Sequence, residues 1–200
     1  MTDPVPVLLA AGASTRMGAH KLLLDFGGEP LVRRAARALL AAGFPELLVV
    51  LGRDPAGVRA ALAGLPARFV ENPDYTASEV PASLLCALDV LPPGAGVLMA
   101  LADMPFVGAA HHARVRAAGA DGRAALSDYG GVVAPPHLIP AGLRGAVAQA
   151  IRAGTPRPLP GVLGPLARTV AQPPEDLLDV DTPEDWARAQ ARLSGENRRV

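Results

Sequence analysis

The sequence predicts one α/β domain of three layers, in which helices cover both faces of a mostly parallel, Rossmann-like sheet. Short apolar runs alternate with longer segments that carry apolar residues at helical spacing, and this order is typical of parallel α/β folds. Several short runs carry no charge, as expected for strands buried on both faces. The chain has 200 residues, half of them hydrophobic, which suffices for one good-sized core. We expect a single domain over 1–195 and a polar tail at 196–200.

The first half of the chain alternates regularly between predicted strands and predicted helices. Pro30 precedes the first helix and Gly43 follows it, which is the common arrangement at helix ends. Asp54 is of the residue type that caps a helix, and it precedes the second one. The expected strands are 5–9, 47–51, 68–70 and 97–101, and the expected helices are 31–42, 55–64 and 83–91.

The second half alternates less clearly. Four prolines within 156–165 favour a loop, because proline lacks the amide proton that helices and sheets use. Thr182, followed by Pro183 and two acidic residues, is typical of a helix start, and we expect Trp186 to anchor that helix by packing. The remaining expected helices are 107–119, 138–153 and the segment from 183, and the expected strands are 124–126, 132–134 and 168–171.

Charge and cysteine content exclude several classes of protein. Nineteen basic and nineteen acidic residues cancel, so any attraction for a phosphorylated ligand must be local. Cys86 is the only cysteine, which excludes an intrachain disulfide, and we expect it to be a buried filler in a helix. The N-terminus lacks signal-peptide features and no apolar run reaches membrane length. We therefore expect a cytoplasmic protein with neither nucleic-acid nor membrane partners.

A glycine-rich segment, LAAGASTRMGAHK at 9–21, follows the first predicted strand. Gly12, Gly18 and their small neighbours let the backbone approach a bound group and point several N–H donors at it. Arg16 and Lys21 add positive charge beside those donors. The segment therefore predicts a cradle for a polyphosphate.

The spacing of this segment excludes two common phosphate-binding loops. A P-loop needs four residues between its glycines and then Lys-Ser or Lys-Thr. Here five residues separate Gly12 from Gly18, and Leu22 follows the lysine. The dinucleotide fingerprint needs G-x-G-x-x-G, and Ser14 stands where its second glycine would be.

Two acidic segments are candidate metal ligands. Asp103 directly follows the predicted strand 97–101, so it is expected at the same sheet edge as the glycine-rich segment. Mg²⁺ prefers one or two carboxylates together with phosphate oxygens and water. Asp179 and Asp181 lie on one side of an extended segment just before the last helix, and either could supply a second carboxylate.

These segments resemble those of a known family. Residues 9–21 resemble the pyrophosphorylase-type loop L-A-x-G-x-S-x-R-M-G-x-x-K, residues 101–105 resemble L-A-D-x-P, and residues 179–185 resemble D-[VI]-D-T-P-E-D. The family is the MobA/MocA-like NTP transferases, the molybdopterin nucleotidyltransferases, whose fold is of the nucleotide-diphospho-sugar transferase type. Ala11-Gly12 is similar to the cytidylyl branch, since the guanylyl enzymes usually carry two glycines there.

The resemblance implies a Mg²⁺-dependent transfer of CMP from CTP to a phosphorylated acceptor such as molybdopterin, with a molybdoenzyme or its chaperone as a further partner. It implies catalytic roles for Arg16, Lys21 and Asp103, and metal binding by Asp103 and Asp181. The nucleotide-binding residues that it implies are Leu9, Ala10, Ala11, Gly12, Ser14, Arg16, Gly18, Lys21, Asn72 and Ser83.

The middle of the chain departs from the family pattern. Residues 129–137 lack the second glycine and the His-Pro order of Y-x-G-x-x-G-H-P, and 79–82 replace a Gly-Met-Ser-Ser-type run. These regions usually shape the acceptor side, so two further readings stay open: a cytidylyltransferase for another phosphorylated small molecule, and a noncatalytic carrier of nucleotide or molybdenum cofactor. We expect His111 and His112 to be solvated at a helix start.

Overall fold

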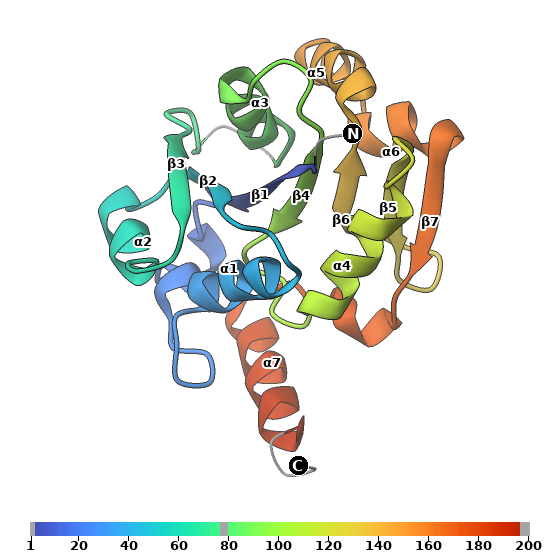
Figure 1. The fold of residues 1–200 in the computed structure, drawn as a ribbon. Helices are drawn as coiled ribbons and strands as arrows, with labels where there is room; N and C mark the ends of the chain where they lie inside the picture. The colour runs from blue at the N-terminus through green and yellow to red at the C-terminus, as the bar shows by residue number, and fades with distance from the viewer. Residues whose placement is uncertain (1–2, 77–79, 197–200) are drawn as a thin grey trace.

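The computed structural model describes residues 3–76 and 80–196 and contains a seven-stranded sheet in the order β3-β2-β1-β4-β6-β5-β7 (Figure 1). Neighbouring strands are parallel, except that β6 runs antiparallel to both β4 and β5. The predicted fold class is confirmed, with one reversed strand. The strands are β1 (Val5–Ala10), β2 (Leu47–Leu51), β3 (Ala67–Glu71), β4 (Val97–Leu101), β5 (Ala124–Asp128), β6 (Val133–Ile139) and β7 (Ala167–Ala171).

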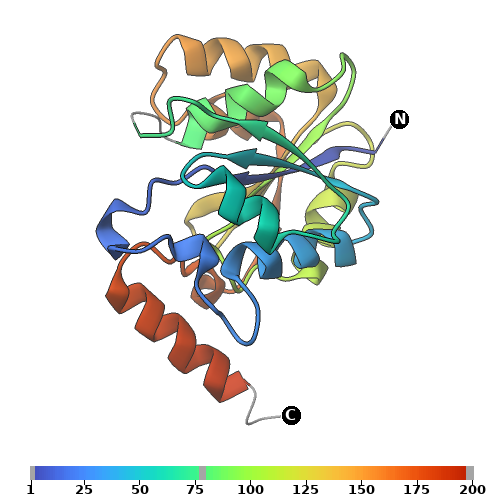
Figure 2. The ribbon, with the colours of Figure 1, turned by 90° about the vertical axis from the view of Figure 1, so that its left-hand side faces the viewer.

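Helices form a layer on each face of the sheet (Figure 2). One apolar core joins the sheet to α1, α2, α4 and α7, and the other joins it to α3, α5 and α6. The outer layers thus give the three-layer arrangement that the sequence predicts. The helices are α1 (Leu31–Ala41), α2 (Pro55–Ala61), α3 (Val80–Val90), α4 (Ala109–Ala118), α5 (Arg144–Arg152), α6 (Pro158–Leu163) and α7 (Pro183–Glu196). None of the described helices is long and apolar enough to cross a membrane.

The central strands are apolar on both sides because each side faces a different core. Leu8 of β1 pairs in register with Ala100 of β4, and both belong to the core under α1. Their neighbours Leu9 and Leu101 also pair, and they face the other core. This register brings the carboxyl ends of β1 and β4 to one sheet edge, so the segments that follow them meet there.

The structure corrects the prediction for the second half of the chain. The expected helix 138–153 is wrong at its start, because Leu138 and Ile139 end strand β6 and α5 begins only at Arg144. The expected strand 132–134 extends through the cis Pro135-Pro136 bond to residue 139. The expected loop 156–165 contains α6, a short helix that begins at a proline, where no amide proton is needed.

Side-chain burial also differs from expectation at several positions. His111 and His112 are buried instead of solvated, since α4 turns both toward the sheet. Cys86 is only half-buried on α3. Trp186 packs edge-on against Phe26, which confirms it as an anchor of α7. The expected tail lies outside the described residues from 197 on, as do Met1, Thr2 and Glu79, while residue 196 still belongs to α7.

Candidate active site

The glycine-rich segment lies at the carboxyl edge of the sheet, directly after β1. It holds a short 3₁₀ helix at Thr15–Met17, flanked by Ser14 and Gly18, which both have positive φ. Leu9 and Ala10 are buried strand residues, so their place in a nucleotide site rests on backbone atoms. The Leu9 carbonyl already accepts a hydrogen bond from the amide of Ala102, which ties the β1 end to the segment that carries Asp103.

Lys21 is the centre of the charged cluster at this edge. Its side chain is only 5% exposed, and its Nζ donates to Asp103 Oδ2 and to Asp181 Oδ1, both at 2.7 Å. Burial alone would lower the pKa of Lys21, but the two carboxylates raise it above its ordinary value. The lysine is therefore charged, and its contact with Asp103 agrees with the prediction that the glycine-rich segment and Asp103 lie at one sheet edge.

Arg16 completes the cluster from the solvent side. Its Nη2 donates to Asp181 Oδ2 at 2.7 Å, and its side chain is 65% exposed. Burial would raise the pKa of Asp181, but hydrogen bonds and charge from Lys21 and Arg16 hold it below its ordinary value. Asp181 is thus an anion shared by two cations, one buried and one exposed.

The carboxylates suit a divalent cation. Asp103 Oδ1 is buried and accepts no hydrogen bond from the described residues. Burial and the nearby charges of Asp103 and Asp181 raise the pKa of Asp179 above its ordinary value. No group of three His, Cys, Asp or Glu side chains within 3–76 and 80–196 could hold a metal ion unaided. Such an ion would need ligand oxygens as well, as Mg²⁺ commonly does.

Asp185 is a residue of this site that the sequence reasoning placed only in a helix start. Its Oδ2 accepts hydrogen bonds from the backbone amides of Asp181 and Thr182 and from the Thr182 hydroxyl. The Asp185 amide donates in return to Thr182 Oγ1, which confirms the predicted cap. This reciprocal cap fixes the backbone that presents Asp181 to Lys21.

Arg53 and His20 form a latch that the sequence reasoning missed. The Arg53 guanidinium donates to the carbonyl of Ala13, and His20 Nε2 lies 2.7 Å from the Arg53 carbonyl. Between these contacts, Gly52 runs so close to the glycine-rich segment that a Cβ would lie 2.4 Å from the Ala11 carbonyl oxygen. A glycine directly after a buried apolar strand was the available signal, since it marks a close backbone approach.

Asn72 and Ser83 meet away from the charged cluster. Asn72 Nδ2 donates to Ser83 Oγ at 3.1 Å, and both residues are buried. The Asn72 carboxamide oxygen also accepts from the Asp74 amide, so the side chain shapes the turn after β3. Ala11 is buried and Gly12 is exposed at the start of the glycine-rich segment. Contacts of these residues with a base or ribose stay a prediction.

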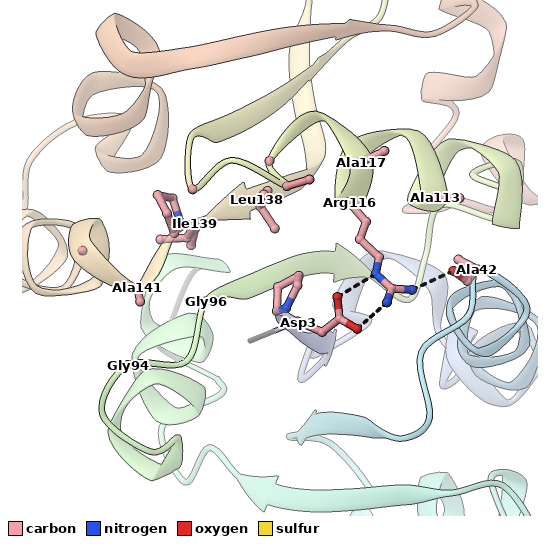
Figure 3. Close-up of a pocket in the computed structure, with 16 residues that line it drawn as sticks. Asp3, Ala42, Gly94, Gly96, Ala113, Arg116, Ala117, Leu138, Ile139 and Ala141 are labelled. Carbon is pink, nitrogen blue, oxygen red and sulfur yellow. Dashed lines mark hydrogen bonds and ion pairs between the residues drawn. The ribbon is translucent and has the colours of Figure 1, made fainter. Parts of the chain in front are cut away.

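An open cavity lies at the opposite edge of the sheet. It has a volume of about 600 Å³ and is lined mainly by glycines, alanines and prolines. Figure 3 shows its main charged pair, in which Arg116 of α4 reaches Asp3 and the Ala42 carbonyl. Arg116 also lies over the ring of Phe44, so its role is to tie α4 to the end of α1. None of the predicted site residues lines this cavity.

Comparisons with known proteins agree with this fold. Residues 6–164 match the family model of the MobA-like NTP transferase domain. Nicotine blue oxidoreductase of Paenarthrobacter nicotinovorans is 34% identical over 153 residues, which span 72% of this chain and 74% of that protein.

Solved structures show the same fold. Rv0371c of Mycobacterium tuberculosis H37Rv is 28% identical with a TM-score of 0.75, covering 95% of this chain and 99% of its own. That protein has also been solved in complex with manganese, at 26% identity, a TM-score of 0.70 and coverage of 95% and 99% of the two chains. The 2-C-methyl-D-erythritol 4-phosphate cytidylyltransferase of Thermus thermophilus is 23% identical with a TM-score of 0.71, covering 96% and 99% of the two chains.

Proposed function

The chain belongs to the family of MobA-like NTP transferases, and from this premise we propose that it transfers CMP from CTP to a phosphorylated acceptor, molybdopterin, with release of pyrophosphate. The observation that carries the proposal is the buried Lys21 between Asp103 and Asp181, beside the glycine-rich segment and at the carboxyl edge of the sheet. In parallel α/β sheets this edge is where ligands bind. We further propose that residues 1–195 act as one catalytic domain in the cytoplasm.

In the proposed reaction, a phosphate oxygen of the acceptor attacks the α-phosphorus of CTP. A new phosphorus–oxygen bond forms as the bond to the bridging oxygen breaks, and pyrophosphate leaves with that electron pair. Arg16, Lys21 and the N–H groups of the glycine-rich segment stabilise the negative charge that builds on the leaving group. An acceptor phosphate is already ionised at neutral pH, so the step requires no general base.

Asp103 and Asp181 are the residues proposed to hold the metal. The unpartnered Asp103 Oδ1 and the hard oxygen donors of both carboxylates suit a cation such as Mg²⁺. The manganese complex of Rv0371c supports a divalent cation in a related fold. When bound, such an ion neutralises charge on the phosphate oxygens. Asp179 is the alternative second ligand, and its raised pKa favours Asp181 instead.

The choice of base is proposed from Ala11. A methyl group at this position makes the start of the loop tighter than glycine would, which favours the smaller pyrimidine. Ala11 is a buried residue of the apolar core against which Tyr75 packs. Because the core is closely packed, the methyl group of Ala11 has little freedom to move away from a bound base. We place Asn72 and Ser83 near the base and ribose, as their family counterparts are.

The activity named for one relative favours a second candidate function. Because nicotine blue oxidoreductase is 34% identical, the same cleft could serve a redox reaction in which the glycine-rich segment holds the diphosphate of a dinucleotide cofactor. The segment lacks G-x-G-x-x-G, which favours nucleotidyl transfer. Transfer to a different phosphorylated small molecule, and a carrier role without turnover, would both use the same nucleotide site.

Calorimetric titration with the four nucleoside triphosphates, first with Mg²⁺ and then with EDTA, tests the proposal. We expect CTP to bind best and only with metal, and we expect pyrophosphate release when molybdopterin is added. Tighter binding of GTP would contradict the role of Ala11. CTP binding without turnover on molybdopterin or on polyol phosphates would favour the carrier. Oxidation of a reduced nicotinamide dinucleotide, without CTP binding, would support the redox candidate instead.

A further inference from the structure

We propose that Lys21 occupies, in the ligand-free protein, the place that a divalent cation needs, so that the metal binds much more tightly together with a polyphosphate than alone. The inference rests on the proposed function, because it assigns the metal to Asp103 and Asp181. It adds an order of binding and makes Lys21 an internal competitor of the metal.

The geometry of the ammonium group supports this competition. Nζ lies 2.7 Å from an oxygen of each carboxylate, so it bridges the two groups in the manner of a shared cation. With a side chain only 5% exposed, against 23% for Asp103 and 31% for Asp181, Lys21 is the more buried partner in both ion pairs. A metal ion that used both carboxylates would have to break both ion pairs with Lys21.

The charge balance of the cluster opposes a metal ion that arrives alone. Asp103 and Asp181 are matched by Lys21 and Arg16, so the four formal charges already cancel. A divalent cation alone would leave this partly buried cluster with excess positive charge, which is costly in a medium of low polarity. When the metal ion binds together with a polyphosphate, the phosphate groups bring negative charge. Lys21 and Arg16 can then pair with the phosphates instead of the carboxylates.

The chain allows Lys21 to move in this way. The backbone of residue 21 is fixed in a short 3₁₀ helix, Lys21–Leu23, but its four-carbon stem can swing the ammonium group. The glycine-rich segment that precedes it is proposed to hold the phosphates, so they would lie within the same crevice. Releasing Lys21 from the carboxylates therefore needs a rotation of one side chain and no rearrangement of the fold.

Mn²⁺ affinity, measured by calorimetry and by electron paramagnetic resonance, tests the order of binding without any turnover. We expect the wild-type protein to bind Mn²⁺ about 10 to 100 times more tightly when inorganic triphosphate is present, and linkage requires the same factor for triphosphate in the presence of Mn²⁺. Lys21→Met should bind Mn²⁺ without triphosphate, with affinity raised by a similar factor. Asp103→Asn in the Lys21→Met background should remove that binding.

Arg16→Met is the matched comparison, because Arg16 contacts only Asp181 within this cluster and is mostly exposed. It should raise Mn²⁺ affinity by less than about threefold, as expected for a solvent-exposed ion pair. Equal gains from Arg16→Met and Lys21→Met would overturn the assigned role, because net charge and not the bridging position would then control metal binding. Thermal unfolding monitors the fold of each variant.

The remaining outcomes separate this inference from the proposed function. If the wild-type protein binds Mn²⁺ equally well with and without triphosphate, the competition is wrong, and this holds even if Lys21→Met fails to fold. If CTP binds but Mn²⁺ affinity responds to neither Lys21 nor triphosphate, only the binding order is overturned. If the wild-type protein binds neither CTP nor any other nucleoside triphosphate, the proposed function fails as well.

Discussion

The two halves of the sheet are stabilised by different means. Strands β1, β2 and β4 are almost wholly apolar, and the ion pairs of Lys21 with Asp103 and Asp181 lie at the carboxyl edge of their half. The half formed by β5, β6 and β7 buries a polar network that includes a histidine. There the Ser127 hydroxyl, fully buried, donates to the Pro136 carbonyl and contacts His111 Nε2 at 2.7 Å. The ion pairs of the first half thus involve partly exposed carboxylates, whereas the Ser127–His111 contact of the second half is buried.

A chain of polar contacts connects the second half to the candidate active site. Arg114 of α4 donates to Gln172, and Gln172 donates to Asp176. Asp176 is paired with Arg192 of α7, the helix whose first turn carries Asp185. Because Asp185 fixes the backbone at Asp181, these contacts link the second half to the segment that carries Asp181.

The largest expected effect comes from the charged groups of the first half. Lys21→Ala and Asp103→Ala should each lower kcat/KM for CTP by about 100- to 1,000-fold, the usual loss when one electrostatic stabiliser of a transition state is removed. Pyrophosphate release measures the rate. Arg59→Ala removes an exposed ion pair with Glu71 in the same half and should behave as wild type. Near-normal rates in both site variants would mean that the catalytic site lies elsewhere.

A smaller effect is expected in the second half. Asp176→Asn weakens the pairing with Arg192 and should cost about 1–3 kcal/mol of unfolding free energy, as is usual for a buried charged hydrogen bond. If Asp176 also positions Asp181, kcat for nucleotidyl transfer should fall about tenfold with little change in the KM for CTP. Chemical denaturation and steady-state kinetics separate these effects. A loss of stability with unchanged kcat would mean that Asp176 stabilises the fold but does not position Asp181.

Acid should destabilise the second half before the first. Burial lowers the pKa of His111 to about 4, helped by the charge of Arg114, and burial lowers that of His112 to about 3 and that of His137 to about 4. These groups bind protons more readily when unfolded, where the pKa is 6.5. The stability that they contribute is complete above about pH 6.5 and is lost as the pH falls toward these values.

Thermal unfolding between pH 7 and 4 measures this dependence. We expect His137→Gln to show a shallower decline of Tm with falling pH than the wild-type protein, although its Tm at pH 7 is lower. A decline of the same steepness would mean that His137 does not contribute to the acid sensitivity.

The smallest effect is expected at the amino edge of the sheet. Ala117 lines the cavity there and is exposed on α4. Ala117→Met should leave kcat/KM within about twofold of wild type, as surface substitutions usually change free energies by less than about 0.5 kcal/mol. A large loss of nucleotidyl transfer would show that this edge, despite its distance from the charged cluster, communicates with the site.

The two halves also differ in how much of their structure the sequence predicts. Leu47–Leu51 is a charge-free run that only a buried strand explains, and its predicted bounds match those of β2. The register of β1 and β4 follows from their neighbouring positions, so the meeting of Lys21 with Asp103 was predictable from two strand ends. In the first half, local pattern and tertiary packing favour the same structure.

In the second half of the chain, local pattern and tertiary packing favour different structures. Strand β6 contains Pro135-Pro136, a pair that local rules assign to a loop or turn, and its antiparallel pairing with β4 and β5 overrides that preference. The burial of His111 and His112 depends on which side of α4 faces the sheet, and the apolar pattern of that helix is too weak to indicate it. The latch between His20 and Arg53 joins residues from different loops, which periodicity does not detect.

The charged cluster joins residues that lie far apart in the sequence. The chain separates Lys21 from Asp181 by 160 residues and Arg16 from Asp181 by 165. Such distant pairs form late, because the intervening chain must first be ordered. During synthesis, the glycine-rich segment emerges with β1, and Asp181 emerges 160 residues after Lys21. The ion pairs that Lys21 and Arg16 make with Asp181 therefore form only after the seven strands of the sheet have been synthesised.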